Sequence, residues 1–491
     1  MMTRLPFKTG LTLVAVAMLG ACATQQDIQP KLQRTDAQQW GLNEPALSSA
    51  DEHGASTDAW WTALGDASLN ALIDRALTSR PSMQVVEARV AKARAQAAAA
   101  HGAEFPQLQA TAEVARQHFT EHGLVPPPLA GTIRSTGTLQ LEGSWELDLF
   151  GRQRALLDAA IGQSRAAQAD AQAARVLLSS QVARAYVQLA RLIAQRDVAH
   201  RTLDQRQEVL GLIRQRVQAG LETTVELRQG EGALPDIRQQ LEAVNEQIAL
   251  TRHALAALSG QPPSATDSLS PSLQALQPVP LPQSVPIDLL ARRADITAAR
   301  WRAEASSHAS DAARALFYPN IEVTGYLGYN AIGLDRLLQA GSLQYGLLPA
   351  IHLPLFDGDR RRANLQGTVA DQDAAVANYN QTIVDAVHEV ADQLSSVDSL
   401  VRQRSEQASA QASVESAYSV ALQRYRAGLG TYLTVLSAET AVLNQRRLGV
   451  DLKARAMEAQ VGLVRALGGT TAAAFMSPSH KNTESSSGDR S

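Results

Sequence analysis

The feature that most restricts the fold is an alternating stretch that runs directly into a very long helical segment. Residues 138–149 alternate between apolar and polar side chains, which predicts a strand with one apolar and one polar face. The acidic members of the polar row are Glu142, Glu146 and Asp148. From Gly151 to Gln218 the chain contains no proline, which predicts a single helix about 100 Å long at about 1.5 Å per residue. This combination is typical of a tube that crosses a membrane and continues beyond it.

The chain also repeats itself. The matching pairs are Arg216–Leu221 with Arg424–Leu429 at an offset of 208, Leu147–Phe150 with Leu353–Phe356 at 206, and Phe105–Leu108 with Tyr318–Ile321 at 213. Three matches in the same order and at nearly the same offset indicate a tandem duplication. We therefore predict a first repeat over 61–260, an extended Pro-rich connector over 261–286 and a second repeat over 287–469.

Each repeat contains two strand candidates. They lie at about 107–114, 138–149, 321–329 and 343–355, with Pro349 and Pro354 weakening the last one. Because about eight strands are the practical minimum for a closed barrel, four strands cannot close one. Apart from the N-terminus, no apolar run approaches the ~20 residues of a transmembrane helix, so other copies of the chain would have to complete a membrane barrel. The apolar row of 138–149 is then expected to face lipid. The acids of the polar row are expected to face the barrel lumen.

The other segments predict two helical hairpins, over 151–259 and 357–467. The two long helices are Gly151–Gln218 and Asp357–Arg426, and the shorter returning helices are Glu222–Ser259, Ile287–Leu316, Thr431–Leu467 and Asp66–His101. Gly220 and Gly428 mark the reversals, where a helix C-terminus favours a residue that tolerates positive φ. Pro235 is predicted to break or kink the helix that contains it.

The N-terminus has the pattern of an export signal. Arg4 and Lys8 precede a short apolar core, which predicts a signal peptide over 1–21. Leu19–Cys22 resembles the lipobox of bacterial lipoproteins, which implies lipid attachment at Cys22, the only cysteine of the chain. The alternative is an ordinary signal peptide with an incidental cysteine. Residues 22–60 are interpreted as a lipidated polar arm and residues 470–491 as a disordered tail.

Composition and motifs argue against nucleic-acid binding and catalysis. The formal net charge is −3, and the sequence contains no basic cluster suited to nucleic acid. The ten histidines are scattered without metal-ligand spacing, and no HExxH, GxSxG or phosphate-loop pattern occurs. We therefore expect no enzyme activity, no cofactor and no metal site, with His308, His352 and His388 as surface or interhelical residues.

Three stretches are similar to the outer-membrane efflux family of the TolC, OprM and NodT type. They are Asp58–Leu77 with its Trp-Trp pair, Trp145–Gly151, and Pro286–Tyr329. In the last stretch Ala294 and Arg300 stand where the family usually has proline and glutamate. The Trp pair has a second interpretation, as the apolar foot of a helix that begins near Asp66.

This resemblance implies a mainly α fold with a membrane β-barrel. A homotrimer would combine four strands per chain into a 12-stranded outer-membrane barrel on a long periplasmic helical barrel. The implied function is the passive exit duct of a tripartite pump for drugs and other small toxic compounds. Its implied partners are an adaptor (membrane fusion) protein, an inner-membrane transporter of the RND type and outer-membrane lipid. The alternatives are a duct for type I protein secretion or for metal-ion efflux.

The resemblance also implies where the periplasmic aperture and the adaptor-contacting tips lie. The residues concerned are Gly220, Leu221, Glu222, Glu226, Gly428, Leu429, Thr434 and Ser437. Many family members carry aspartates near the second tip, at positions that correspond to Thr434 and Ser437. We therefore expect less acid at the second tip and a weaker block by cations. The alternative for these two residues is that they only pack between helices.

Overall fold

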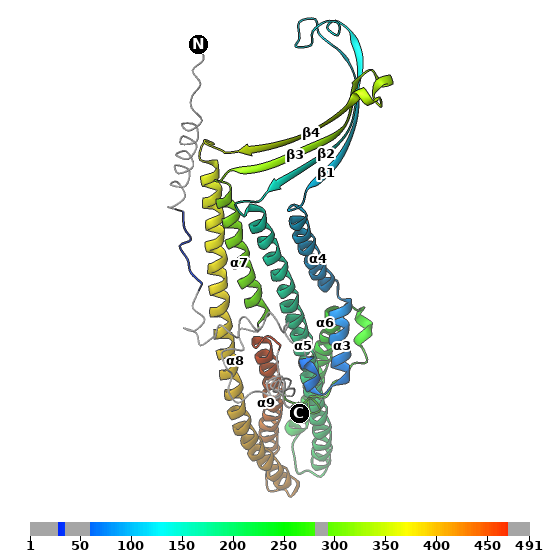
Figure 1. Cartoon of the computed structure of the whole chain (residues 1–491). Coiled ribbons are helices and arrows are strands. Elements are labelled where there is room, and N and C mark those ends of the chain that lie inside the picture. Colours follow the sequence, from blue (N-terminus) through cyan, green and yellow to red (C-terminus); the bar gives the residue numbers. More distant parts are fainter. Residues whose placement is uncertain (1–27, 35–58, 280–292, 470–491) are drawn as a thin grey trace, which may run out of the picture. The chain divides into compact units, whose positions relative to one another are not determined.

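The computed structural model describes residues 28–34, 59–279 and 293–469, and it is mainly helical with one small sheet (Figure 1). The helices are α3 (Ala67–Ser79), α4 (Pro81–Gly102), α5 (Arg152–Gln218), α6 (Thr224–Leu258), α7 (Ala294–Ala315), α8 (Arg360–Arg426) and α9 (Tyr432–Ala466). This mixture agrees with the predicted fold class. The signal peptide, Cys22, most of the polar arm and the tail 470–491 lie outside the described residues.

The described residues form two compact units. Unit 1 holds 28–34, 89–168 and 298–381, and unit 2 holds the remainder. The long helices α5 and α8 each contribute residues to both units.

Unit 1 contains a four-stranded antiparallel sheet in the order β1-β2-β3-β4. Its strands are β1 (Gln107–His118), β2 (Ile133–Leu147), β3 (Asn320–Ile332) and β4 (Leu343–His352). β2 therefore ends two residues before the predicted boundary at 149. The Leu149 amide donates to the Leu147 carbonyl at 2.9 Å, which turns the chain out of the strand. β4 runs through Pro349 but ends before Pro354, and its position at the sheet edge explains why it tolerates a proline.

The strand register separates an apolar face from a polar face. On the apolar face Leu141 lies opposite Ala110 on one side and Leu327 on the other, and Leu141 is 47% exposed. On the polar face Gln109 Nε2 donates to Glu142 Oε2 at 2.8 Å, and Gln344 Nε2 donates to Gln140 Oε1 at 2.7 Å. The alternation predicted for β2 thus extends across the sheet.

The helix predicted over 66–101 is two helices. Arg80, between α3 and α4, has the extended backbone angles φ −71° and ψ 128°. The prediction was wrong because Pro81 disfavours helical angles in the residue before it. Asp66 is the N-cap of α3, and its Oδ1 accepts from the Ser68 amide at 2.8 Å.

Of the two effects predicted for Pro235, a break or a kink, the break does not occur. α6 continues from Thr224 to Leu258 with Pro235 inside it. Proline removes one helical hydrogen bond and costs roughly 3 kcal/mol in a helix interior. The buried residues Gly230, Ile237 and Leu241 on either side of Pro235 offset this cost by packing.

The main hydrophobic core of unit 2 includes the Trp-Trp pair. Trp60 and Trp61 lie in a short 3-10 turn ahead of α3, and Trp60 Nε1 donates to Ser179 Oγ at 3.2 Å. They are therefore separate from the first turn of α3. The described part of the connector, predicted to be an extended spacer, instead packs into this core through Leu273, Leu276 and Val279.

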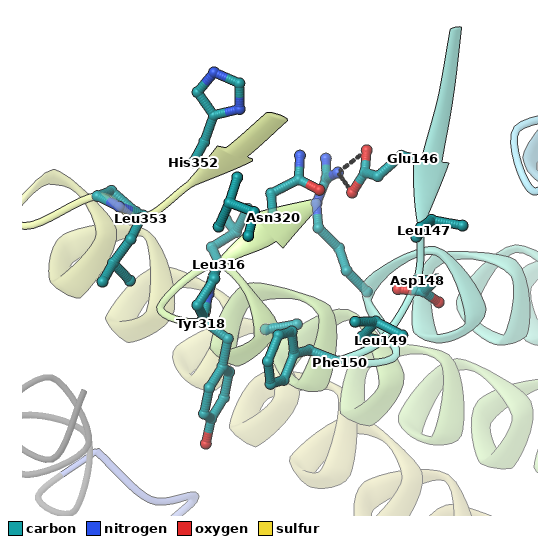
Figure 2. A pocket seen from close by; sticks show the side chains of 15 residues that line it. Glu146, Leu147, Asp148, Leu149, Phe150, Leu316, Tyr318, Asn320, His352 and Leu353 are labelled. Atoms are coloured by element: carbon teal, nitrogen blue, oxygen red, sulfur yellow. Dashed lines mark hydrogen bonds and ion pairs between the residues drawn. The ribbon is translucent and has the colours of Figure 1, made fainter. Parts of the chain in front are cut away.

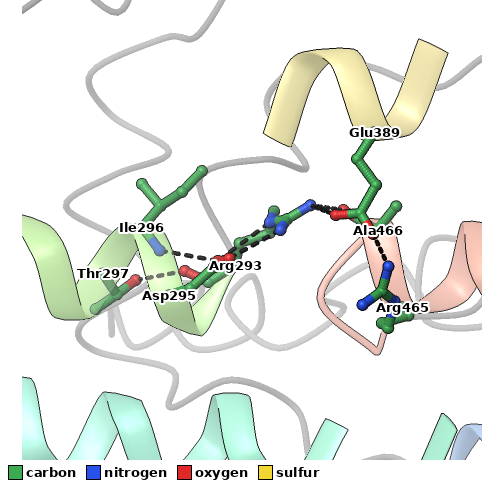
Figure 3. A network of polar contacts seen from close by, with 7 residues as sticks. All are labelled: Arg293, Asp295, Ile296, Thr297, Glu389, Arg465 and Ala466. Atoms are coloured by element: carbon green, nitrogen blue, oxygen red, sulfur yellow. Dashed lines mark hydrogen bonds and ion pairs between the residues drawn. The ribbon is translucent and has the colours of Figure 1, made fainter. Parts of the chain in front are cut away.

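A partly buried arginine joins three helices of unit 2 where α7 begins (Figure 3). Arg293 donates to Asp295 Oδ2 at 2.8 Å, to Glu389 Oε2 at 2.9 Å and to the Ala466 carbonyl at 2.9 Å. Arg465 also donates to Glu389. Burial lowers the Arg293 pKa, but the bonds to Asp295 and Glu389 outweigh burial and raise it. One of the stretches that resemble the efflux family, Pro286–Tyr329, therefore contains an ion-pair network that joins α7, α8 and α9.

Candidate functional site

The two hairpins end in tips of the same backbone geometry. The first tip is 219–223 and the second is 427–431. Gly220 and Gly428 have φ values of +71° and +76°. The Leu221 amide donates to the Arg216 carbonyl at 2.9 Å, and the Leu429 amide donates to the Arg424 carbonyl at 2.8 Å. Both tips are thus Schellman motifs, which explains the glycine at each reversal.

The tips differ in how the next helix is capped. Thr223 Oγ1 accepts from the Val225 amide at 3.1 Å, and Glu226 accepts in return from the Thr223 amide at 3.1 Å. This capping box lowers the pKa of Glu226, chiefly through the Thr223 hydroxyl. In the second tip Thr431 is the N-cap, and Thr434 occupies the position equivalent to Glu226. The first tip therefore keeps a carboxylate at a position where the second has a hydroxyl.

Two further acids near the tips are paired with arginines. Glu222 Oε1 accepts from Arg216 Nε at 3.3 Å. Glu439 is buried, and its Oε2 accepts from Arg206 Nε at 3.1 Å. Burial raises the pKa of Glu439 despite the attraction of Arg206. Neither acid therefore adds an unpaired negative charge at the tips.

Arg216 links the ends of α5 and α8, the two helices that lead into the tips. Its Nη1 donates to the Tyr425 carbonyl at 3.3 Å, and its guanidinium lies 5.0 Å from the centroid of the Tyr425 ring. Burial, followed by the charge of Glu222, raises the pKa of Tyr425 to about 12. Arg216 and Tyr425 were not among the predicted site residues. Their place in the two matching Arg-x-x-Ala-Gly-Leu motifs was the available signal.

The remaining tip residues predicted for the site are exposed in the single chain. Leu221 is 66% exposed and Leu429 is 69% exposed. Thr434 and Ser437 are exposed as well, while Val435 between them is buried in a hydrophobic cluster with Tyr425 and Tyr432. Within the single chain, Thr434 and Ser437 therefore have no packed environment between helices.

The three acids predicted for the barrel lumen do not form one row. Glu142 and Glu146 lie on the polar face of β2, where Arg152 Nη1 donates to Glu146 Oε1 at 3.0 Å. Asp148 lies beyond the end of β2, and its Oδ2 accepts from the Arg154 amide at 2.9 Å. Asp148 thus caps the start of α5 instead of extending the strand.

A pocket of about 570 Å³ lies where β2, β3 and β4 meet the helices of unit 1 (Figure 2). Glu146, Phe150, Tyr318 and His352 are among its lining residues. Among the described residues, no group of three or more His, Cys, Asp or Glu side chains is placed to hold a metal ion. None of the described helices combines the length and the apolarity needed to span a bilayer.

Comparison with known proteins gives one family. The family model "Outer membrane efflux protein" matches residues 72–261 and 285–469. The multidrug resistance outer membrane protein MdtQ of Escherichia coli O6:H1 is 34% identical over 463 residues, which cover 92% of this chain and 96% of MdtQ. The fusaric acid resistance protein FusA of Burkholderia cepacia is 37% identical over 363 residues, which cover 72% of this chain and 68% of FusA.

A solved structure agrees with this result. The outer membrane protein VceC of Vibrio cholerae superimposes with a TM-score of 0.79 at 37% identity, over 84% of this chain and 98% of VceC. The two matched segments of the family model also lie close to the two repeats at 61–260 and 287–469. The chain therefore belongs to the outer membrane efflux protein family.

Proposed function

We propose that this chain forms a homotrimer that serves as the passive exit duct of a tripartite efflux pump. Three four-stranded sheets would close a 12-stranded barrel in the outer membrane, and the helices would form the periplasmic part of the duct. A periplasmic adaptor and an inner-membrane transporter of the RND type would supply the connection and the energy. The names of MdtQ and FusA favour small organic toxic compounds as the cargo.

The observation that carries this proposal is an incomplete sheet with an exposed apolar face. β1 and β4 are the two edges of the sheet, and each pairs with one strand among the residues that the structure describes. Leu108 on β1 and Leu347 on β4 are 72% and 73% exposed. An exposed edge with apolar side chains favours pairing with another strand, and a closed barrel satisfies both edges at once. Lipid would cover the apolar face.

We also propose that Cys22 is lipidated. Ile28 packs against Ala313 near the end of α7 and against Leu365 near the start of α8. The amides of Lys31 and Leu32 each donate to Asp373 Oδ1 at 2.9 Å. A fully extended peptide from Cys22 to Ile28 spans at most about 20 Å. A lipid on Cys22 would therefore lie near the helix ends that adjoin β3 and β4, as an outer-membrane anchor requires. Metabolic labelling with palmitate should label the wild type and not Cys22→Ser.

The two tips are proposed as the periplasmic aperture and the adaptor contact. Leu221 and Leu429 are exposed, so each tip carries an apolar side chain that the adaptor would contact. Glu226 would supply the acid of the aperture, with Thr434 and Ser437 as its uncharged counterparts on the second hairpin. Cross-linking from a photoreactive residue at Leu221 or Leu429 should capture the adaptor in whole cells.

Deletion of the gene tests the efflux role directly. The strain should accumulate more of at least one antibiotic, dye or detergent, or of fusaric acid, and should become more sensitive to it. The wild-type gene should restore both properties. Unchanged accumulation and sensitivity for all of these compounds would contradict the proposal. Altered sensitivity to metal ions alone, or loss of a secreted protein alone, would instead support the metal-efflux or the secretion alternative.

A further inference from the structure

The duplication places two aromatic residues in each repeat, one before its first strand and one after its second. They are Phe105 and Phe150 in the first repeat, and Tyr318 and Phe356 in the second. Phe150 and Tyr318 stack with ring centroids 4.9 Å apart and an interplanar angle of 9° (Figure 2). The end of the strand pair of the first repeat therefore contacts the start of the strand pair of the second through this aromatic pair.

The pairing of β2 with β3 explains why these two rings meet. Leu147 lies opposite Ile321 at the end of the ladder. Phe150 follows Leu147 by three residues and Tyr318 precedes Ile321 by three, so both rings leave the sheet at the same point. The stack thus forms where a strand of the first repeat pairs with a strand of the second.

The equivalent pair, Phe356 and Phe105, cannot meet within one chain. Phe356 follows β4 and Phe105 precedes β1, and these strands form opposite edges of the sheet. At about 4.8 Å per strand, three spacings separate the edges by about 14 Å. Phe356 is 91% exposed and Phe105 is 55% exposed, with one contact of its ring to His101 at 5.2 Å. Both rings are therefore accessible to another molecule.

We propose that Phe356 of one copy stacks on Phe105 of the next copy, in the way that Phe150 stacks on Tyr318. The four strands alternate in direction, so β4 and the β1 of the next copy meet antiparallel, as β2 and β3 do. The apolar residues Leu355 and Leu108 beside these rings are 75% and 72% exposed. This contact rests on the proposed homotrimer, where it would give a ring of six aromatic stacks, three within chains and three between them.

Cysteine cross-linking in isolated membranes tests this contact. The double variant Phe105→Cys, Phe356→Cys is treated with a short bifunctional thiol reagent and run on a denaturing gel. We expect covalent dimers and trimers, since the two thiols belong to different copies. The double variant Phe150→Cys, Tyr318→Cys is the matched control. It should lose its free thiols with the same reagent and still migrate as a monomer.

Further variants separate this contact from the homotrimer itself. No covalent oligomer should form in either single variant, Phe105→Cys or Phe356→Cys, or in the double variant Phe356→Cys, Tyr318→Cys. This result would also show that Cys22 does not form the cross-links. Amine cross-linking of each variant reports whether oligomers form at all. Oligomers that form while the Phe105, Phe356 pair stays uncross-linked would overturn the aromatic contact and leave the duct intact. Absence of oligomers in the wild type would overturn the proposed duct as well.

Discussion

Thr223 shows how a single side chain defines the first tip. Its hydroxyl and the Glu226 carboxylate satisfy two amides at the start of α6. Thr223→Ala should weaken this helix start by about 1 kcal/mol, which corresponds to roughly fivefold faster hydrogen exchange in the first turn of α6. Mass spectrometry of the exchanging protein measures this change.

Thr431→Ala is the matched control in the second tip. The Thr434 amide lies 3.4 Å from Thr431 Oγ1, so this cap is longer and lacks a reciprocal carboxylate. Its removal should accelerate exchange less than Thr223→Ala, and Thr223→Ser should retain most of the protection. Equal effects at the two tips would show that the capping box contributes nothing extra.

Glu439 should give the tip region a pH-dependent stability. Burial raises its pKa in the folded state above the ordinary value of 4.5. The folded state therefore holds this proton more tightly than the unfolded state, so the stability contribution is complete below pH 4.5 and is lost as pH rises through the raised pKa. Glu439→Gln cannot ionise, and its amide oxygen can still accept from Arg206. The melting temperature of the wild type should fall more steeply than that of Glu439→Gln from pH 4.5 towards neutrality.

Glu246→Gln, an exposed substitution on α6, is the control for this comparison. It should follow the wild-type pH profile. A profile of Glu439→Gln that is indistinguishable from the wild type would contradict the role assigned to the buried carboxyl.

The roles of residues that depend on the local backbone could be predicted from the sequence. The pairing of side chains that are far apart in the sequence could not. Gly220 and Gly428 were assigned to the reversals because a Schellman motif leaves a recognisable sequence. The pairing of Arg206 with Glu439 joins residues 233 positions apart, and no local pattern encodes it. Asp148 was assigned to the polar row of β2 because it continues the alternation, although the backbone turns before it.

At the scale of elements, β2 offers a direct test of the two faces. Leu141 and Glu142 are neighbours that lie on opposite faces of the sheet. Leu141→Lys should destabilise the assembled protein in lipid by about 2–4 kcal/mol if it lies near mid-bilayer, because a lipid-facing charge loses its hydration. Glu142→Lys should leave stability nearly unchanged and alter conductance. Urea titration of the folded protein in vesicles, together with bilayer recordings, measures both effects.

Equal stability of the two variants would contradict the assignment of the apolar face to lipid. If Leu141→Lys changed conductance and Glu142→Lys did not, the face assigned to lipid would instead face the lumen. Because the variants differ by one position on the same strand, strand propensity and distance from the membrane surface are nearly matched.

Element types followed from periodicity, whereas the effect of each proline depended on its surroundings. Pro81 is the first residue of α4, and it favours the extended backbone angles of Arg80 that separate α4 from α3. Pro235 does not end α6, since buried neighbours hold the helix on both sides. The Pro-rich connector contains buried leucines that pack into unit 2, which its overall composition did not indicate.

At the scale of the whole molecule, the duplication predicted two strands in each repeat, and the barrel-closure argument predicted that four strands leave the sheet incomplete. The family was predicted from the resemblance of three stretches to known efflux proteins. Four strands per chain, two from each repeat, form one antiparallel sheet in sequence order. The proposed contacts between copies would involve residues that are exposed in a single chain, such as Phe356. They were inferred from the repeat and not from the fold of one chain.

The assembled duct should respond to divalent cations mainly through Glu226. A trimer would place one Glu226 carboxylate per copy around the aperture, whereas Thr434 holds the equivalent position on the second hairpin and carries no charge. Close carboxylates attract divalent cations strongly in a narrow pore, because the low-dielectric walls focus their field. We expect weak block of single-channel conductance by millimolar Mg²⁺ in the wild type, weaker block in Glu226→Ala and stronger block in Thr434→Asp. Thr434→Ala should match the wild type. Loss of block in Thr434→Ala with block retained in Glu226→Ala would show that the second hairpin, not the first, forms the constriction.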